Sequence, residues 1–194
     1  MRQLLFHLFL ALILVPVRVA FVGDSITGEP NGYVSYVEQG HNILSARFLP
    51  RHLADAIVDW PYVDEFEPDT IVVELGAHAV IGCDHLPGQD MAVFEQRYSQ
   101  ILDRATRSSD HVVVLTIPWL GWGENVTPRA QQYSAVIERL AAQYKAEVVD
   151  AWEILHSCGA ACVSADGVHP NGEGHRRVAE AVSEVLLPKQ IPED

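Results

Sequence analysis

The sequence has little positive charge, few cysteines and no paired metal-binding motif. Thirteen lysines and arginines face 26 aspartates and glutamates, which gives the 194-residue chain a formal net charge of −13 at pH 7. Such a surface repels phosphate backbones and anionic headgroups, so the charge argues against nucleic acid as a partner. The three cysteines include no pair of Cys-x-x-Cys motifs, so a structural zinc site is not expected.

The chain also lacks internal repeats, low-complexity stretches and any linker rich in proline, glycine and serine. Hydrophobic residues make up 48% of the sequence and charged residues 20%. This composition excludes a disordered chain, a collagen and a coiled coil. A chain of 194 residues is long enough to bury a core without disulfides or metals. One globular domain is therefore expected.

The three cysteines leave the redox state open. Cys158 and Cys162 lie in the stretch Cys-Gly-Ala-Ala-Cys. This spacing fits a small loop disulfide in an oxidising compartment, and it equally fits two free thiols in a turn. Cys83 is expected to be an unreactive small residue.

The first 16 residues form a separate apolar segment. Residues 4–17 are mostly apolar, but a run of 14 residues is short for a membrane span. The run fits an export signal, an uncleaved anchor or an extension packed on the domain. If the segment is an export signal, the protein is expected to be secreted or membrane-associated, with membrane contact only through residues 1–17. If it is not, a cytoplasmic protein is expected. We predict no cleavage within residues 18–22, because they belong to the first predicted strand.

Short runs of β-branched and other apolar residues predict the strands of a sheet. Runs that end at turn residues are typical of strands buried on both faces. The predicted strands span residues 17–22, 70–75, 111–117 and 147–150, with a weaker candidate at residues 42–47. Between them, apolar residues repeat at helical spacing. The predicted helices span residues 49–60, 91–107, 128–144 and 170–187, the last with Pro170 at its first position.

Alternating strands and helices predict one domain built on a parallel sheet of about five strands, with helices on both faces. The predicted domain covers residues 17–188 and is followed by a tail at residues 189–194. Ligands of such folds bind at the carboxyl ends of the strands. Chemistry is therefore expected just after Val22, Leu75 and Ile117.

A serine follows the first predicted strand directly, in the sequence Gly23-Asp24-Ser25. A tight turn at this position places the serine hydroxyl at the edge of the sheet. A serine hydroxyl is a weak nucleophile and needs an adjacent base. Taken alone, the tripeptide fits a helix N-cap at least as well, since Ser and Asp both cap helices.

The far end of the chain supplies a matching base. Asp166 lies three residues before His169, on a loop that leads into the last predicted helix. A histidine there can take the serine proton while the aspartate orients its imidazole. An isolated Asp-x-x-His is a weak signal, but its pairing with the Gly-Asp-Ser turn is a stronger one.

These two motifs resemble the first and last sequence blocks of the SGNH (GDSL) hydrolase superfamily. The resemblance covers roughly residues 18–187, and it extends to the sequence Asp-Gly-Val-His-Pro-Asn around His169. It implies a flavodoxin-like α/β sandwich of three layers. It also implies that Ser25 is the nucleophile, His169 the base and Asp166 the carboxylate that orients the base.

The middle blocks depart from that family. The third block normally reads Gly-x-Asn-Asp, and its Asn donates to the oxyanion, whereas here Gly76 is followed by Ala77, His78 and Ala79. A histidine ring N–H can replace the Asn as a donor. We therefore expect His78 and Gly76 to belong to the oxyanion or substrate site, and the other interpretation is that His78 merely fills the pocket of a weakened enzyme.

The second block of the family normally provides a glycine whose backbone N–H is another oxyanion donor. No glycine occurs in residues 42–51, and Ser45 or Ala46 is the nearest equivalent. A backbone N–H does not depend on the side chain, so Ala46 is a candidate donor. The loss of one such donor costs about 10²–10³ in rate, which leaves a slow enzyme rather than an inactive protein.

The remaining candidates lie outside these motifs, and two of them follow the predicted strand at residues 111–117. Trp119 and Trp122 either form the wall of a substrate pocket or pack as ordinary loop residues. The residues Cys83, Asp84 and His85 match no standard set of metal ligands. His175 is expected at the surface of the last helix.

The sequence therefore predicts a serine esterase that acts on acetyl or short acyl esters of small molecules or carbohydrates. Its chemistry requires no metal or cofactor. One alternative is a non-catalytic or weakly active binding domain with the same fold, supported only by the altered middle blocks. Another is an acyltransferase, since transfer and hydrolysis use the same triad.

Overall fold

The computed structural model describes residues 15–82, 89–121 and 126–187. Its centre is a parallel sheet of five strands in the order β2-β1-β3-β4-β5. The strands are β1 (Val17–Gly23), β2 (Ile43–Phe48), β3 (Thr70–Glu74), β4 (His111–Leu115) and β5 (Glu147–Val149). All five strands predicted from the sequence are confirmed, including the weaker candidate that became β2.

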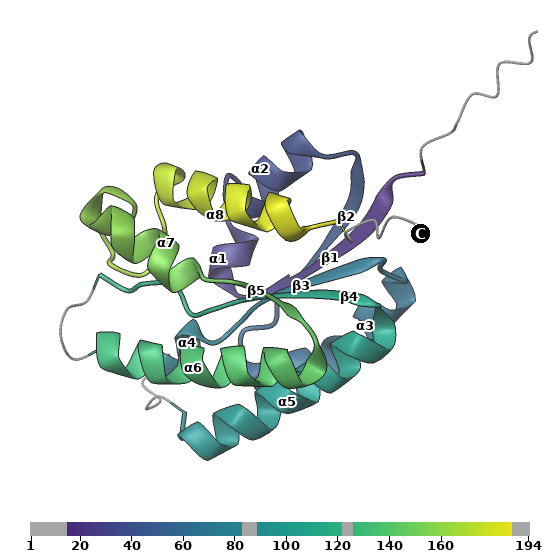
Figure 1. Ribbon diagram of the computed structural model, residues 1–194, viewed down its shortest axis with the longest axis horizontal. Coiled ribbons are helices and arrows are strands. Elements are labelled where there is room, and N and C mark those ends of the chain that lie inside the picture. The colour runs from purple at the N-terminus through teal and green to yellow at the C-terminus, as the bar shows by residue number, and fades with distance from the viewer. Residues whose placement is uncertain (1–14, 83–88, 122–125, 188–194) are drawn as a thin grey trace, which may run out of the picture.

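Helices cover both faces of the sheet and complete three layers (Figure 1). One face carries α3 (Leu53–Phe66), α4 (Ala77–Ile81), α5 (Met91–Ser108) and α6 (Thr127–Tyr144). The other face carries α1 (Ser25–Gly28), α2 (Tyr33–Gly40), α7 (Ala151–Cys158) and α8 (Gly172–Val185). The predicted three-layer α/β fold is therefore confirmed.

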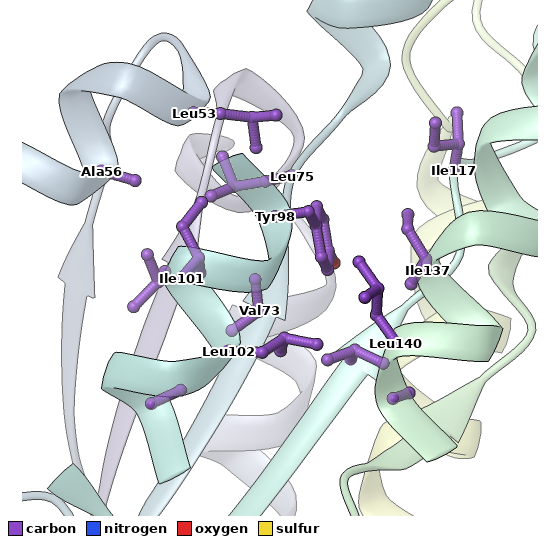
Figure 2. Close-up of a cluster of buried hydrophobic side chains, with 14 of the residues drawn as sticks. Leu53, Ala56, Val73, Leu75, Tyr98, Ile101, Leu102, Ile117, Ile137 and Leu140 are labelled. Carbon is purple, nitrogen blue, oxygen red and sulfur yellow. The ribbon is translucent and has the colours of Figure 1, made fainter. Parts of the chain in front are cut away.

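The central strands divide their side chains between two cores. Every residue of β3 and β4 is buried. Ile71 and Val73 face the core under α3, α5 and α6, where Figure 2 shows Val73 near Leu102 of α5. Val72, between them, faces the opposite core with Val182 of α8. This alternation explains why the strands read as continuous apolar runs.

Several helix boundaries differ from those predicted. Helix α3 begins later than expected and continues through Pro61 to Phe66. Helix α8 begins at Gly172, because the side chain of Asn171 accepts hydrogen bonds from the first turn and acts as its N-cap. Pro170 instead forms an antiparallel bridge with Val163, so its prediction as the first helical residue is wrong.

The structure also answers the question of the cysteine pair. Cys158 and Cys162 form a disulfide, with Cα atoms 5.6 Å apart, at the end of α7. Among the described residues, no helix is long and apolar enough to cross a bilayer. Residues 1–14, the set Cys83, Asp84 and His85, and Trp122 lie outside the described residues.

Candidate active site

The nucleophile candidate lies on a crowded turn at the carboxyl end of β1. Asp24 is the N-cap of α1, and its Oδ1 accepts a hydrogen bond from the Ile26 N–H at 3.1 Å. A Cβ atom at Gly23 would overlap the side chain of Thr27, so only glycine fits there. The turn leaves Ser25 exposed to solvent as the first residue of α1.

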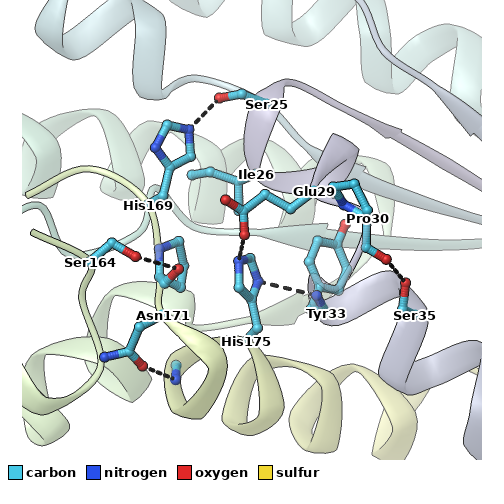
Figure 3. Close-up of polar contacts among 12 residues, drawn as sticks. Ser25, Ile26, Glu29, Pro30, Tyr33, Ser35, Ser164, His169, Asn171 and His175 are labelled. Carbon is cyan, nitrogen blue, oxygen red and sulfur yellow. Dashed lines mark hydrogen bonds and ion pairs between the residues drawn. The ribbon is translucent and has the colours of Figure 1, made fainter. Parts of the chain in front are cut away.

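Ser25, His169 and Asp166 form an uninterrupted chain of hydrogen bonds. The Ser25 Oγ lies 2.8 Å from His169 Nε2, and His169 Nδ1 lies 2.7 Å from Asp166 Oδ2 (Figure 3 shows the first contact). A carboxylate can only accept, so Nδ1 carries the proton of a neutral imidazole. The lone pair of Nε2 therefore faces the serine hydroxyl, which is the arrangement that proton removal requires.

Asp166 is fixed by its own backbone as well as by His169. Its Oδ1 accepts hydrogen bonds from the N–H groups of Val168 at 2.9 Å and His169 at 3.0 Å. These hydrogen bonds, that of the Val168 N–H above all, lower the pKa of Asp166 to about 2. The side chain is half exposed, but it remains a carboxylate throughout the neutral and mildly acidic range.

The loop that carries Asp166 and His169 is tied to its surroundings. The N–H of Gly121, which follows β4, donates to the carbonyl of Gly167 at 2.8 Å. Within the loop, the N–H of Ser164 donates to the carbonyl of His169 at 2.8 Å. Gly167 has a φ of 72°, a conformation that glycine adopts without strain.

His175 links the two ends of the triad and is buried, so the expectation that it lies at the helix surface is wrong. Its side chain is 2% exposed. Nε2 lies 2.7 Å from Glu29 Oε2, and Nδ1 accepts the N–H of Tyr33 at 3.1 Å (Figure 3). The first turn of α8 is thereby joined to the segment that follows the nucleophile turn. No local motif signals this contact, because Glu29 lies 146 positions from His175.

Two buried carboxyl groups lie beneath the nucleophile. Asp24 is 4% exposed and Glu74, at the end of β3, is 1% exposed. Glu74 Oε2 accepts the Thr27 hydroxyl at 2.9 Å and so braces the turn from below. Burial raises the pKa of Glu74 well above its usual value, and the neighbouring charge of Asp24 adds to this. Burial also raises the pKa of Asp24. The sequence signal for this site is a carboxyl residue, Glu74, at the end of an apolar strand.

His78 lies beside the cleft, on α4, after the carboxyl end of β3. It lines the same hollow as Ser25 and His169. Its ring meets that of His52 edge to face, with centroids 5.7 Å apart. Its Nδ1 is buried without a hydrogen-bond partner among the described residues. His78 thus belongs to the wall that a substrate bound at Ser25 would meet.

The other predicted oxyanion or substrate residues fall in three different places. Ala46 pairs with Ala20 within the ladder between β1 and β2, two residues before the carboxyl end of β2 at Phe48. From this part of the chain, Leu49, Pro50 and Arg51 line the cleft instead, so the prediction of Ala46 as an oxyanion donor is wrong. Gly76, with a φ of 134°, forms the N-cap of α4 and lines a cavity behind His78.

Trp119 packs away from the cleft. Its ring meets His156 of α7 at a centroid distance of 5.9 Å, and it packs against the second core. It is absent from the linings of both the cleft and the cavity behind His78. These contacts favour the interpretation of Trp119 as ordinary loop packing.

Two neighbouring hollows lie at this site. The outer cleft has a volume of about 530 Å³ and contains Ser25 and His169. The inner cavity has a volume of about 270 Å³. Both are lined by Asp24, Arg51 and His78, which form the boundary between them. In the described part of the chain, no group of three or more His, Cys, Asp or Glu side chains is placed to hold a metal ion.

Comparison with known proteins places this geometry in a family. The GDSL-like lipase/acylhydrolase family matches residues 21–177, which include all three triad residues. The chain belongs to that family. This membership confirms the resemblance noted from Ser25 and His169.

Individual relatives are more distant. A multidomain esterase of Ruminococcus flavefaciens is 30% identical over 125 residues, which is 61% of this chain and 16% of that protein. The GDSL domain thus spans about a sixth of that relative. An acetylxylan esterase from Geobacillus stearothermophilus has a structure with a TM-score of 0.75 at 21% identity, covering 89% of this chain and 95% of its own.

A second solved structure gives the same result. It is an alpha/beta hydrolase enzyme from the metagenome of Lake Arreo, Spain, with a TM-score of 0.76 at 17% identity. The match covers 88% of this chain and 96% of the other. At such identities the likeness establishes the shared fold.

Proposed function

We propose that this domain hydrolyses carboxylic esters through an acyl-enzyme on Ser25. The observation that carries the proposal is the hydrogen-bonded chain from Ser25 Oγ through His169 to Asp166, with distances of 2.8 Å and 2.7 Å. A binding domain would have no need for this arrangement in the wall of an open cleft. The intact chain therefore favours catalysis over the alternative of a non-catalytic domain.

In the first half of the reaction, Ser25 Oγ attacks the ester carbonyl carbon while His169 Nε2 takes the hydroxyl proton. The resulting imidazolium is stabilised by the carboxylate of Asp166. When the tetrahedral intermediate collapses, the bond to the alcohol oxygen breaks and His169 returns the proton to that oxygen. The alcohol leaves, and the acyl group remains bonded to Ser25.

In the second half, water replaces the alcohol. His169 takes a proton from the water, whose oxygen attacks the acyl carbon, and then returns the proton to Ser25 Oγ as the carboxylic acid departs. Negative charge develops on the carbonyl oxygen in both halves. We assign its stabilisation to the backbone N–H of Ser25, at the start of α1, and to the imidazole of His78.

The substrates proposed are acetyl or short acyl esters of small molecules or carbohydrates. The names of the acetylxylan esterases among the structural relatives support a carbohydrate alcohol. Turnover of p-nitrophenyl esters from acetate to octanoate tests the activity. We expect measurable hydrolysis that disappears in Ser25→Ala, and an absence of turnover by the wild-type protein would contradict the proposal.

A further inference from the structure

The inner cavity behind His78 has no role in the proton transfers described above. It adjoins the cleft through Asp24, Arg51 and His78, but neither Ser25 nor His169 lines it. A substrate held at Ser25 could therefore extend into it past His78. The question is which half of an ester, the acyl group or the alcohol, lies in that direction.

The position of His169 decides between the two halves. His169 must return a proton to the alcohol oxygen, so that oxygen has to lie on the His169 side of the reacting carbon. The acyl substituent is bonded to the same carbon and must leave in another direction. The inner cavity, which His169 does not line, is the space on the other side of the boundary formed by Asp24 and His78.

The walls of the cavity suit an aliphatic chain. Leu53, Ala54, Leu75 and Ala79 supply apolar surface, and Figure 2 shows Leu53 and Leu75 close to each other above Tyr98. The remaining lining residues, besides Gly76 and the boundary residues, are the polar His52, Asp55, Gln89 and Arg97. The methyl group of an acetyl ester is about the size of a water molecule, ~30 Å³. It would leave most of the 270 Å³ unfilled.

We propose that the inner cavity binds the acyl group of the ester, and that the enzyme prefers straight-chain acyl groups longer than acetyl. This inference rests on the proposed function. Each methylene buried against apolar surface is worth about a fourfold gain in kcat/KM. Butanoate should therefore be hydrolysed about 15-fold more efficiently than acetate.

The test compares kcat/KM for p-nitrophenyl butanoate and acetate in three proteins. Ala54→Phe places a large side chain in the cavity, and the butanoate-to-acetate ratio should fall about 15-fold, to near one. Val58→Phe is the matched control, on the same helix but 74% exposed and outside the cavity, and should keep the wild-type ratio. If Ala54→Phe does not fold by circular dichroism, Ala54→Leu replaces it.

Three results would overturn the inference while leaving the esterase proposal intact. A wild-type ratio at or below one is the first, and an unchanged ratio in Ala54→Phe is the second. The third is that Ala54→Phe alters only the preference for the alcohol. This would appear as a lower ratio of kcat/KM for butyl acetate to kcat/KM for ethyl acetate. By contrast, no turnover of any ester, together with no fluorophosphonate labelling of Ser25, would overturn the proposed function itself.

Discussion

On the His169 side of the cleft, each nitrogen of the catalytic ring has a partner, at 2.8 Å on Ser25 and 2.7 Å on Asp166. On the opposite side, the ring of His78 leaves Nδ1 without a partner among the described residues. The first side also follows the family motif residue by residue, whereas the second replaces the usual Asn by His78. We call the first the closed side, because its polar groups are hydrogen-bonded to one another. The second is the open side, because the ring of His78 has an unpaired nitrogen among the described residues.

This difference reflects what each side has to do. Proton transfer requires fixed distances before substrate arrives, so its groups are bonded to one another and to the backbone. An oxyanion donor needs its partner only in the transition state, so it can remain unsatisfied in the free enzyme. The contrast predicts that substitutions on the two sides differ in size and in the kinetic constant that they change.

The largest effect is expected for Ser25→Ala, which removes the nucleophile. We expect kcat to fall by about 10⁴–10⁶, because only binding and oxyanion contacts remain. Steady-state turnover of p-nitrophenyl acetate measures the loss. Ser157→Ala, which changes an exposed serine of α7, serves as the control and should retain full activity. Comparable activity in both variants would remove Ser25 from the mechanism.

Asp166→Asn should have the next largest effect, a fall in kcat of about 10²–10⁴. The loop geometry survives, but the imidazolium loses its charged partner, so fluorophosphonate labelling of Ser25 becomes slow yet detectable. An unchanged labelling rate would exclude Asp166 from the triad.

The pKa of Asp166 adds a pH signature to this comparison. Because its pKa is lowered to about 2, the carboxylate stays charged as the pH falls and is lost only near that value. The side-chain carboxyl carbon of Asp166, followed by 13C NMR in the folded protein, should thus show the ionised form from pH 8 down to about pH 4. A carboxyl group that is already substantially protonated at pH 4 would show that Asp166 titrates in its ordinary range.

On the open side, His78→Ala should lower kcat by about 10²–10³ with little change in KM, since the lost contact exists chiefly in the transition state. His78→Asn restores the donor usual in the family and should recover part or all of the activity. Full activity in His78→Ala would leave backbone N–H groups as the oxyanion donors.

A smaller effect is expected for Glu74, which supports the closed side from below through Thr27. Glu74→Ala leaves the Thr27 hydroxyl without this buried partner, which should cost about 1–3 kcal/mol in the free energy of unfolding. We expect kcat to fall about tenfold as the nucleophile turn loosens, a loss of about 1.4 kcal/mol in transition-state stabilisation. Denaturation by urea and steady-state kinetics measure the two quantities.

Glu74→Gln removes the titratable carboxyl group but keeps an oxygen that can accept the hydrogen bond of the Thr27 hydroxyl. A raised pKa in the folded state means that the folded protein holds its proton where the unfolded chain releases it. Wild-type stability should therefore decline as the pH rises above about 4.5, and Glu74→Gln should lack that part of the decline. Its advantage in unfolding free energy should be larger at pH 8 than at pH 5, and equal values would contradict the assignment.

Much of the fold could be predicted because its strands are short buried runs with clear ends. The helices α1, α2, α4 and α7 were missed, since they have only four to eight residues and offer little periodicity. Of the candidate site, Ser25, Asp166 and His169 could be found because local motifs carry them.

The errors concern properties that only tertiary structure sets. Ala46 was misplaced because its position depends on the register between β1 and β2. Trp119 was undecided because the path of its loop depends on packing against α7. The burial of His175 depends on Glu29, a residue from the other end of the chain.

The central claim is that Ser25 forms the acyl-enzyme, and mass spectrometry of the labelled protein tests it most directly. The protein is treated with a fluorophosphonate, digested and sequenced by tandem mass spectrometry, with His169→Ala treated in parallel. We predict one adduct, on Ser25, that forms rapidly in the wild type and far more slowly in His169→Ala. An adduct on another residue, or none on Ser25 in a folded protein, would contradict the account.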